Sequence, residues 1–93
     1  MIVGIVRIRL HISDCQSLKD KRSVVSSLIR RLRNKFNAAI AEIDDQDLWQ
    51  ESTIGAAVIG GSTAHASSQL QSIIDFVEGQ PVTMVTAIET EIL

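Results

Sequence analysis

The stretch MIVGIVRIRLHI, residues 1–12, alternates between two kinds of side chain from its second residue onward. The even positions are aliphatic or glycine, whereas the odd positions end in Arg7, Arg9 and His11. Successive side chains of a strand point to opposite faces, so this period of two predicts a long strand with one buried face. The other face of the strand is expected to be partly polar.

Helical and strand patterns then follow in turn. Apolar residues at helical spacing predict an amphipathic helix over residues 18–36, and Ser17 with Asp20 resembles the capping box that begins many helices. Small and β-branched residues predict two strands, 38–44 and 53–60, joined by the sequence DQDLWQES.

The C-terminal part repeats the helix-then-strand pattern. A second apolar stripe predicts a helix over about residues 64–78, with Gly79 as a left-handed C-cap and Pro81 blocking continuation. Residues 82–93, VTMVTAIETEIL, predict the last strand.

The resulting order, β-α-β-β-α-β, predicts a single α+β domain over residues 1–93 with a ferredoxin-like fold. Because strand–helix–strand crossovers are right-handed, both helices should cover one face of a four-stranded antiparallel sheet with strand order 4-1-3-2. The opposite face, the open face of the sheet, would have no cover from this chain. Its side chains therefore bear on function.

Composition narrows the class of protein. The 93 residues are 45% hydrophobic and 22% charged, which is typical of a folded soluble domain. The single cysteine, Cys15, excludes an internal disulfide and fits a reducing compartment. The N-terminal apolar run reaches Arg7 too early for a signal peptide or a membrane span. We therefore expect a cytoplasmic protein with no membrane partner.

Two motifs resemble the YlxP-like family of bacterial proteins. Residues 17–22, SLKDKR, follow the first predicted strand, and residues 46–50, QDLWQ, fall between the second and third predicted strands. The resemblance runs along the whole chain and implies a small ferredoxin-like domain without an established activity. Genes of this family often lie beside genes for translation and ribosome maturation, which implies an RNA-related setting.

Charge is concentrated in the first predicted helix. Residues 19–35 hold seven basic residues and one acid, a sum of +6, whereas the rest of the chain sums to −8. At 100° per residue, one flank of the helix collects a basic line of roughly 21 Å at 1.5 Å per residue. This basic flank consists of Lys19, Arg22, Arg30 and Arg33, and Lys21, close to the apolar stripe, is added as a further candidate.

Two interpretations of the basic flank stay open. A solvated helix face usually mixes Glu with Lys, and this helix contains no Glu. The helix dipole explains basic residues near the C-terminal end, such as Arg33 and Lys35, but not Lys19 or Arg22. The preferred interpretation is a non-enzymatic protein that binds RNA or a ribosomal particle through this flank. The alternative is a merely solvated face.

The open face suggests a function of another class. It has no aromatic residue on which bases could stack, and its arginines should pair with glutamates of the last strand. Its apolar residues would otherwise be open to water, so the alternative function is an interaction module that forms a homodimer. The candidate interface consists of Val3, Ile5, Ile59, Val85 and Ala87.

Other candidate sites have plainer explanations. Trp49 lies in the connection between the second and third predicted strands, close to the acidic residues 44–47, and serves either as a partner anchor or as a hairpin residue folded over the sheet. The acids lack the spacing of a calcium loop, so no metal is expected. The GGST sequence at 60–63 lacks the lysine of a phosphate-binding loop, and Cys15 has no nearby histidine. The sequence therefore favours a binding protein without a cofactor over an enzyme.

Overall fold

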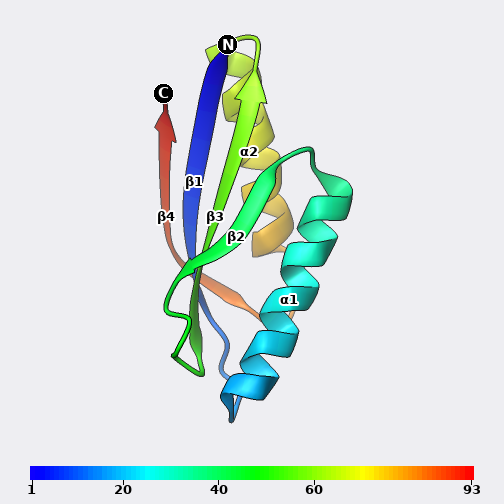
Figure 1. Ribbon diagram of the computed structural model, residues 1–93, viewed down its shortest axis with the longest axis vertical. Coiled ribbons are helices and arrows are strands. Elements are labelled where there is room, and N and C mark those ends of the chain that lie inside the picture. The colour runs from blue at the N-terminus through cyan, green and yellow to red at the C-terminus, as the bar shows by residue number, and fades with distance from the viewer.

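The computed structural model describes all residues, 1–93, and contains the predicted elements in the predicted order (Figure 1). The bounds of the elements are β1 Ile2–His11, α1 Leu18–Lys35, β2 Ala39–Asp44, β3 Glu51–Gly60, α2 Thr63–Glu78 and β4 Met84–Ile92. Two strands begin two residues away from their predicted starts, β3 earlier and β4 later.

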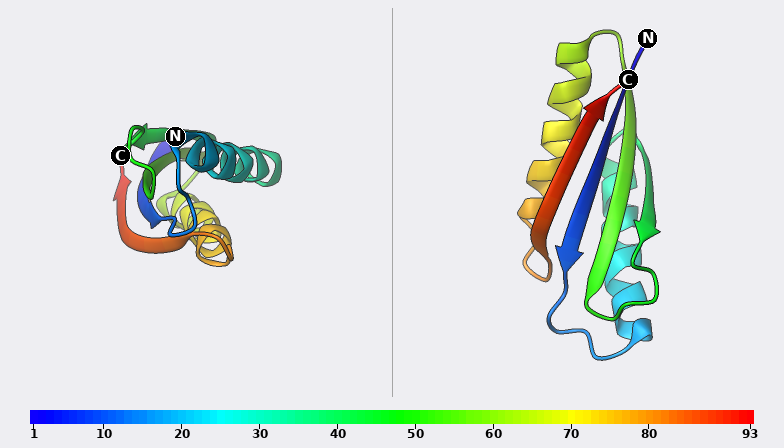
Figure 2. Two further views of the ribbon diagram at one scale, coloured as in Figure 1. Left: turned by 90° about the horizontal axis from the view of Figure 1, so that it is seen from below. Right: turned by 90° about the vertical axis from the view of Figure 1, so that its left-hand side faces the viewer.

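The four strands form one antiparallel sheet in the order β2-β3-β1-β4. This is the predicted order 4-1-3-2 counted from the other edge. Both helices lie behind the sheet in the right-hand view of Figure 2, so the other face is uncovered. The protein is therefore an α+β domain with the ferredoxin-like arrangement, as the sequence predicted.

The core lies between the sheet and the two helices. The even positions of β1 from Gly4 to Leu10 are buried there and Ile2 is partly buried, which confirms the alternation of residues 1–12. They pack against Leu28 and Leu32 of α1 and against Leu70 and Ile73 of α2. A smaller apolar cluster at the start of α1 joins Ile12, Cys15 and Val25.

The helix ends are capped by side chains. The Ser17 hydroxyl accepts a hydrogen bond from the Asp20 N–H at 3.1 Å, so α1 begins as predicted. The prediction of a left-handed Gly79 was wrong, because its φ is −78°. The Gly79 N–H still donates to the Asp75 carbonyl, and the Gln80 side chain caps the Phe76 carbonyl. The last turn of α2 therefore needs no left-handed residue.

A β-bulge in β4 changes the predicted position of one residue. Arg9 lies opposite Ala87, but the next residue of β1, Leu10, lies opposite Val85, so Thr86 is the extra residue. This shift turns Val85 toward the helices, where it packs against the main core. The assignment of Val85 to the open face was therefore wrong, whereas Ala87 does share that face with Arg9.

No helix of the protein is both long enough and apolar enough to cross a membrane.

Candidate nucleic-acid interface

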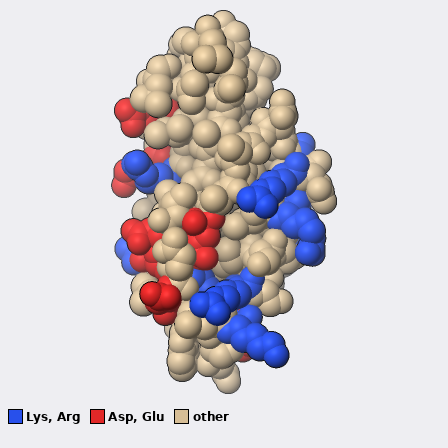
Figure 3. Space-filling model, viewed as in Figure 1, with Lys and Arg blue, Asp and Glu red and all other residues tan.

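Helix α1 lies beside β2, on the side of the molecule opposite β4 (Figure 1). Val25, Leu28 and Leu32 are buried on its inner side. Its two flanks are left for polar residues, because an amphipathic helix buries only one stripe. Figure 3 shows Lys and Arg side chains along α1, beside acidic side chains that gather over the β2–β3 connection.

Three members of the basic flank have no partner within the protein. The side chains of Lys19, Arg22 and Arg30 are exposed and make neither an ion pair nor a hydrogen bond. Lys19 and Arg30 are eleven residues apart, which is about 16 Å along a helix at 1.5 Å per residue. These three cations therefore form a line that is free to meet an external anion.

The fourth member of the flank is engaged. The Arg33 guanidinium donates a hydrogen bond from Nη2 to the Ile40 carbonyl at 2.6 Å. This bond ties the end of α1 to the second residue of β2. Arg33 is still exposed as a residue, so it adds charge to the line, but its position is set by the fold.

The opposite flank of α1 faces the second helix and is also engaged. Arg31 donates to the Ser27 carbonyl and to the side-chain oxygen of Gln80. The Lys35 ammonium lies 5.3 Å from the centroid of the Phe76 ring, within the range of a cation–π contact. Both basic residues of this flank thus have a partner within the chain.

The structure corrects the inclusion of Lys21 in the candidate surface. Its side chain is fully buried, and its ammonium lies 2.6 Å from Glu42 Oε2. The ammonium also donates hydrogen bonds to the carbonyls of Asp45, at 2.8 Å, and Gln46, at 3.2 Å. A buried ammonium requires such partners, because leaving it unpaired in the core is costly. Lys21 is therefore closed to an external partner.

Sequence reasoning missed the polar network around Lys21. Glu42 Oε2 also accepts a hydrogen bond from the hydroxyl of Ser52, a fully buried residue, at 2.6 Å. The network joins α1 to β2, β3 and the turn between them. The available signal was a lysine on the apolar stripe of a helix, which calls for a buried acid elsewhere in the fold.

Asp45, at the start of the acidic connection between β2 and β3, is paired within the chain. Asp45 has a φ of 63°, and its Oδ2 accepts a hydrogen bond from the Thr53 hydroxyl at 2.7 Å and lies 3.6 Å from Arg9 Nε. No group of three or more His, Cys, Asp or Glu residues is arranged to hold a metal ion. Trp49 is 54% exposed, so it does not fold into the core.

Cys15 lies in a poor environment for a nucleophile. Its thiol is buried, and burial together with the negative charges of Asp20 and Asp14 raises its pKa. A raised pKa lowers the fraction of reactive thiolate at neutral pH.

The open face presents an apolar floor bordered by ion pairs. Ile5 lies opposite Ala57, and Val3 lies opposite Ile59, which is 63% exposed. A shallow hollow in this floor is lined largely by small residues of β2 and β3 and by Ile43, which covers Gly55. On the same face, Arg7 lies 3.7 Å from Glu89. The face thus holds four of the five predicted interface residues, all except Val85.

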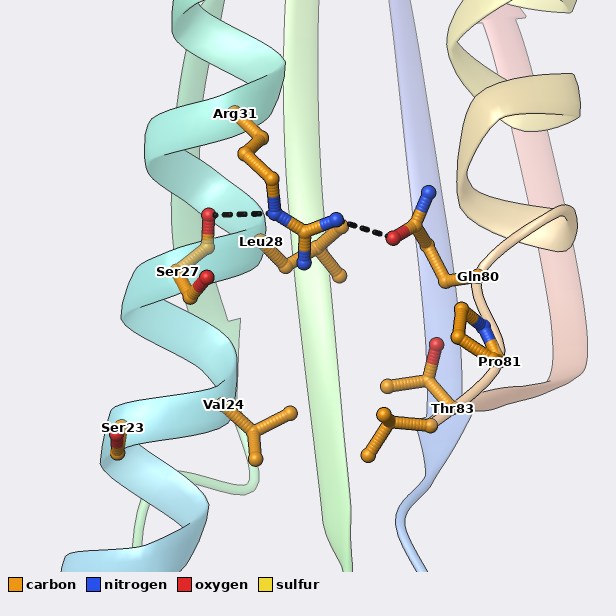
Figure 4. Close-up of a pocket in the computed structure, with 9 residues that line it drawn as sticks. Ser23, Val24, Ser27, Leu28, Arg31, Gln80, Pro81 and Thr83 are labelled. Carbon is orange, nitrogen blue, oxygen red and sulfur yellow. Dashed lines mark hydrogen bonds between the residues drawn. The ribbon is translucent and has the colours of Figure 1, made fainter.

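A groove of about 410 Å³ separates α1 from the segment between α2 and β4 (Figure 4). Val24 and Leu28 form one wall, and the Arg31 side chain reaches across the groove to Gln80. The hydroxyl of Thr83, on the opposite wall, is buried without a hydrogen-bond partner. Arg31 is the only charged residue that lines the groove, so the groove contains no pair of groups for acid–base chemistry.

Comparison with known proteins gives a consistent result over nearly the whole chain. The family model described as "Protein of unknown function (DUF503)" matches residues 3–90. A relative in Bacillus subtilis (strain 168), named "Uncharacterized protein YlxP", is 34% identical over 90 residues. The match covers 97% of this chain and 98% of that relative.

Proposed function

The chain belongs to the DUF503 family of proteins of unknown function, as its motifs indicated, and we propose that it binds single-stranded RNA through helix α1. The RNA would be free or exposed on a ribosomal particle. The observation that carries the proposal is the line of three unpaired cations, Lys19, Arg22 and Arg30.

The pairing of the other basic residues makes this line distinctive. Arg7, Arg9 and Lys21 pair with carboxylates, and the remaining cations of α1 contact backbone or side-chain groups of the chain. In a chain of net charge −2, unpaired basic residues are therefore confined to one flank of one helix. Such a flank attracts a polyanion locally even though the whole protein does not.

The geometry supports contacts to phosphates rather than to bases. A line of about 16 Å is long enough to contact several successive phosphates, which lie ~3.4 Å apart per strand along a duplex axis and farther apart in an extended single strand. The open face offers no aromatic side chain for stacking, so the usual sheet-based reading of RNA bases is not available. Binding should therefore depend on salt and only weakly on sequence. This role places the protein in the cytoplasm, where a single thiol stays reduced.

The test measures affinity for a single-stranded RNA of mixed sequence by fluorescence anisotropy at several salt concentrations. Three contacts at ~0.7 counterions each predict a slope of log K against log salt of about −2. Replacing two of the cations, Arg22→Gln with Arg30→Gln, should flatten the slope by about 1.4. The matched control, Arg31→Gln with Lys35→Gln, changes the net charge equally on the opposite flank and should leave most of the slope.

Two results would contradict the proposal. One is a parent protein that does not bind RNA near 100 mM salt. The other is an equal loss of affinity in the two double variants, which would show a response to net charge rather than to the basic flank.

A second candidate function, self-association through the open face, is supported by the apolar floor around Ile5 and Ile59. Water would otherwise cover this floor, and its bordering arginines are already neutralised by acids of the same face. Replacing Ile5 with Lys should then convert a dimer to a monomer in light scattering, whereas Lys at exposed Ala64 on α2 should not. A parent protein that is monomeric at tens of micromolar, roughly the range for modest interfaces, would remove this candidate.

A further inference from the structure

Strand β4 forms an edge of the sheet that no other element of the chain covers. It lies at the end of the strand order, and no element lies outside it in Figures 1 and 2. Seven of its nine residues are exposed, and residues 84–92 contain no Lys, Arg or Pro. Long edge strands usually carry such residues, because unpaired backbone groups recruit other strands.

The other edge of the sheet is protected. Strand β2 has six residues, its pairing with β3 shifts between Glu42 and Asp44, and α1 packs beside it. A short, bulged and covered edge is a poor template for another strand. β4 also has a bulge, at Thr86, but the residues that follow it, 87–92, pair regularly with β1 and are not covered by a helix.

The pairing pattern shows which backbone groups of β4 are free. Leu93 and Val3 exchange two backbone hydrogen bonds. Because bonded and non-bonded pairs alternate in an antiparallel ladder, every second residue of β4, counted back from Leu93, also bonds to β1 through its backbone. These inward-bonding residues include Glu91 and Glu89. The N–H and C=O groups of Thr90 and Ile88 consequently point away from the sheet. Ile88 also keeps 39% of its surface exposed, although its side chain lies on the helix-covered face opposite Ile8.

We propose that β4 pairs antiparallel with β4 of a second copy around a two-fold axis at Ile88, which makes one continuous eight-stranded sheet. Ile88 is the middle residue of Met84–Ile92, so in this register the two strands overlap along their length, and the bulge at Thr86 interrupts the regular pairing near each end. The two Ile88 residues exchange two hydrogen bonds, and their exposed side chains cover each other. The interface is thus self-complementary, as a two-fold contact requires.

Charge on the open face favours this register over the registers shifted toward the C-terminus of β4. An axis at Glu89 sets Glu89 opposite itself, and an axis at Thr90 sets Glu89 opposite Glu91. Like charges directly opposite each other destabilise a pair of strands. With the axis at Ile88, Glu89 instead lies opposite Ala87 of the second copy. The small Ala87 side chain leaves Glu89 facing the next strand of that copy, where Arg9 lies.

This contact is separate from the open face and from the basic flank. It uses the edge of β4, whereas α1 lies at the β2 side of the sheet. The contact can therefore be tested without RNA and with the open face unchanged.

The test uses two single-cysteine additions, Ile88→Cys and Thr90→Cys, under mild oxidation, with the buried Cys15 as the shared background. The proposed register places the two residues 88 about 5.5 Å apart between Cα atoms, within the range of a disulfide. The two residues 90 are four positions out of register, about 13 Å apart, which a disulfide cannot span. We expect a disulfide-linked dimer from Ile88→Cys and little from Thr90→Cys.

A third variant, Ile88→Pro, removes an outward N–H and no hydrogen bond to β1. It should be monomeric in light scattering and folded by circular dichroism, whereas the parent and the open-face variant Ile5→Lys should both have twice the 10.2 kDa chain mass. A monomeric Ile5→Lys with a dimeric Ile88→Pro would assign the dimer to the open face and overturn the proposal. A monomeric parent overturns the proposal. Cross-linking of Thr90→Cys in preference to Ile88→Cys also overturns it, since that result fits another register. If Ile88→Pro does not fold, the cysteine pair alone decides.

Discussion

Replacing Lys21 with Met should destabilise the protein severely although it removes a positive charge from a strongly basic helix. The Lys21 side chain is fully buried, and its ammonium lies 2.6 Å from Glu42 Oε2 and bonds to two turn carbonyls. Met has a similar length and fills most of the same space. The loss should therefore come from the partners left behind, above all from the Glu42 carboxylate, whose side chain is 17% exposed.

Breaking a buried ion pair on one side typically costs about 3–5 kcal/mol, because the remaining charge is uncompensated. A domain of 93 residues has a total stability of about 5–14 kcal/mol at 0.05–0.15 kcal/mol per residue. Lys21→Met should thus remove a large part of the free energy of unfolding. Adding Glu42→Gln should restore part of the loss, because Gln is uncharged and can still accept the Ser52 hydrogen bond.

Urea denaturation of the parent, both single variants and the double variant gives a double-mutant cycle for this pair. Lys19→Met is the matched control: it removes the same charge from an exposed position of α1 and should change stability by no more than about 0.5 kcal/mol. A Lys21→Met variant within about 1 kcal/mol of the parent would refute the reasoning. So would a double variant that is no more stable than Lys21→Met alone.

Cys15 should react slowly with a thiol reagent at pH 8 in the native protein and rapidly in urea, because burial and the adjacent acids raise its pKa and lower its thiolate fraction. Native labelling as fast as that of a free cysteine would contradict this expectation. Val85→Asp should lower the melting temperature strongly, since Val85 packs against the core, whereas Ala64→Asp at an exposed position of α2 should lower it little. Equal effects in thermal denaturation would contradict the packing of Val85 against the core.

The order of elements was predictable because each element has a local pattern of its own. Period two in residues 1–12 and the apolar stripe of residues 18–36 depend only on neighbours in the sequence. Right-handed crossovers then leave few ways to arrange four strands and two helices. Fold class and strand order could therefore be deduced without any knowledge of long-range contacts.

The errors share a physical cause, which is dependence on contacts between distant residues. The bulge at Thr86 turns the Val85 side chain from the open face to the helix-covered face. No residue type in VTMVTAIETEIL requires a bulge there. Lys21 can be buried because Glu42 of β2, more than twenty residues away in the sequence, forms an ion pair with it. In the same way, Arg33 is engaged only because β2 brings the Ile40 carbonyl to the end of α1.

The basic line of α1 and the edge of β4 lie at opposite edges of the sheet. Dimerisation through β4 would therefore affect how the protein binds RNA of different lengths. In the paired sheet the order runs from β2 through β4 to β4 and β2 of the second copy, so the two β2 strands lie about 34 Å apart at ~4.8 Å per strand. Each α1 lies beside a β2, which places the two basic lines at the two ends of the assembly. An RNA that covers one line of about 16 Å cannot reach the other. A longer strand can occupy both lines, and its second contact is then intramolecular and gains from a high effective concentration. Self-association through β4 would thus increase affinity for long RNA and leave affinity for short RNA unchanged. If affinity no longer depends on RNA length in Ile88→Pro, the two surfaces act together. If the dependence on length persists in Ile88→Pro, it arises from contacts of the RNA with a single copy of α1.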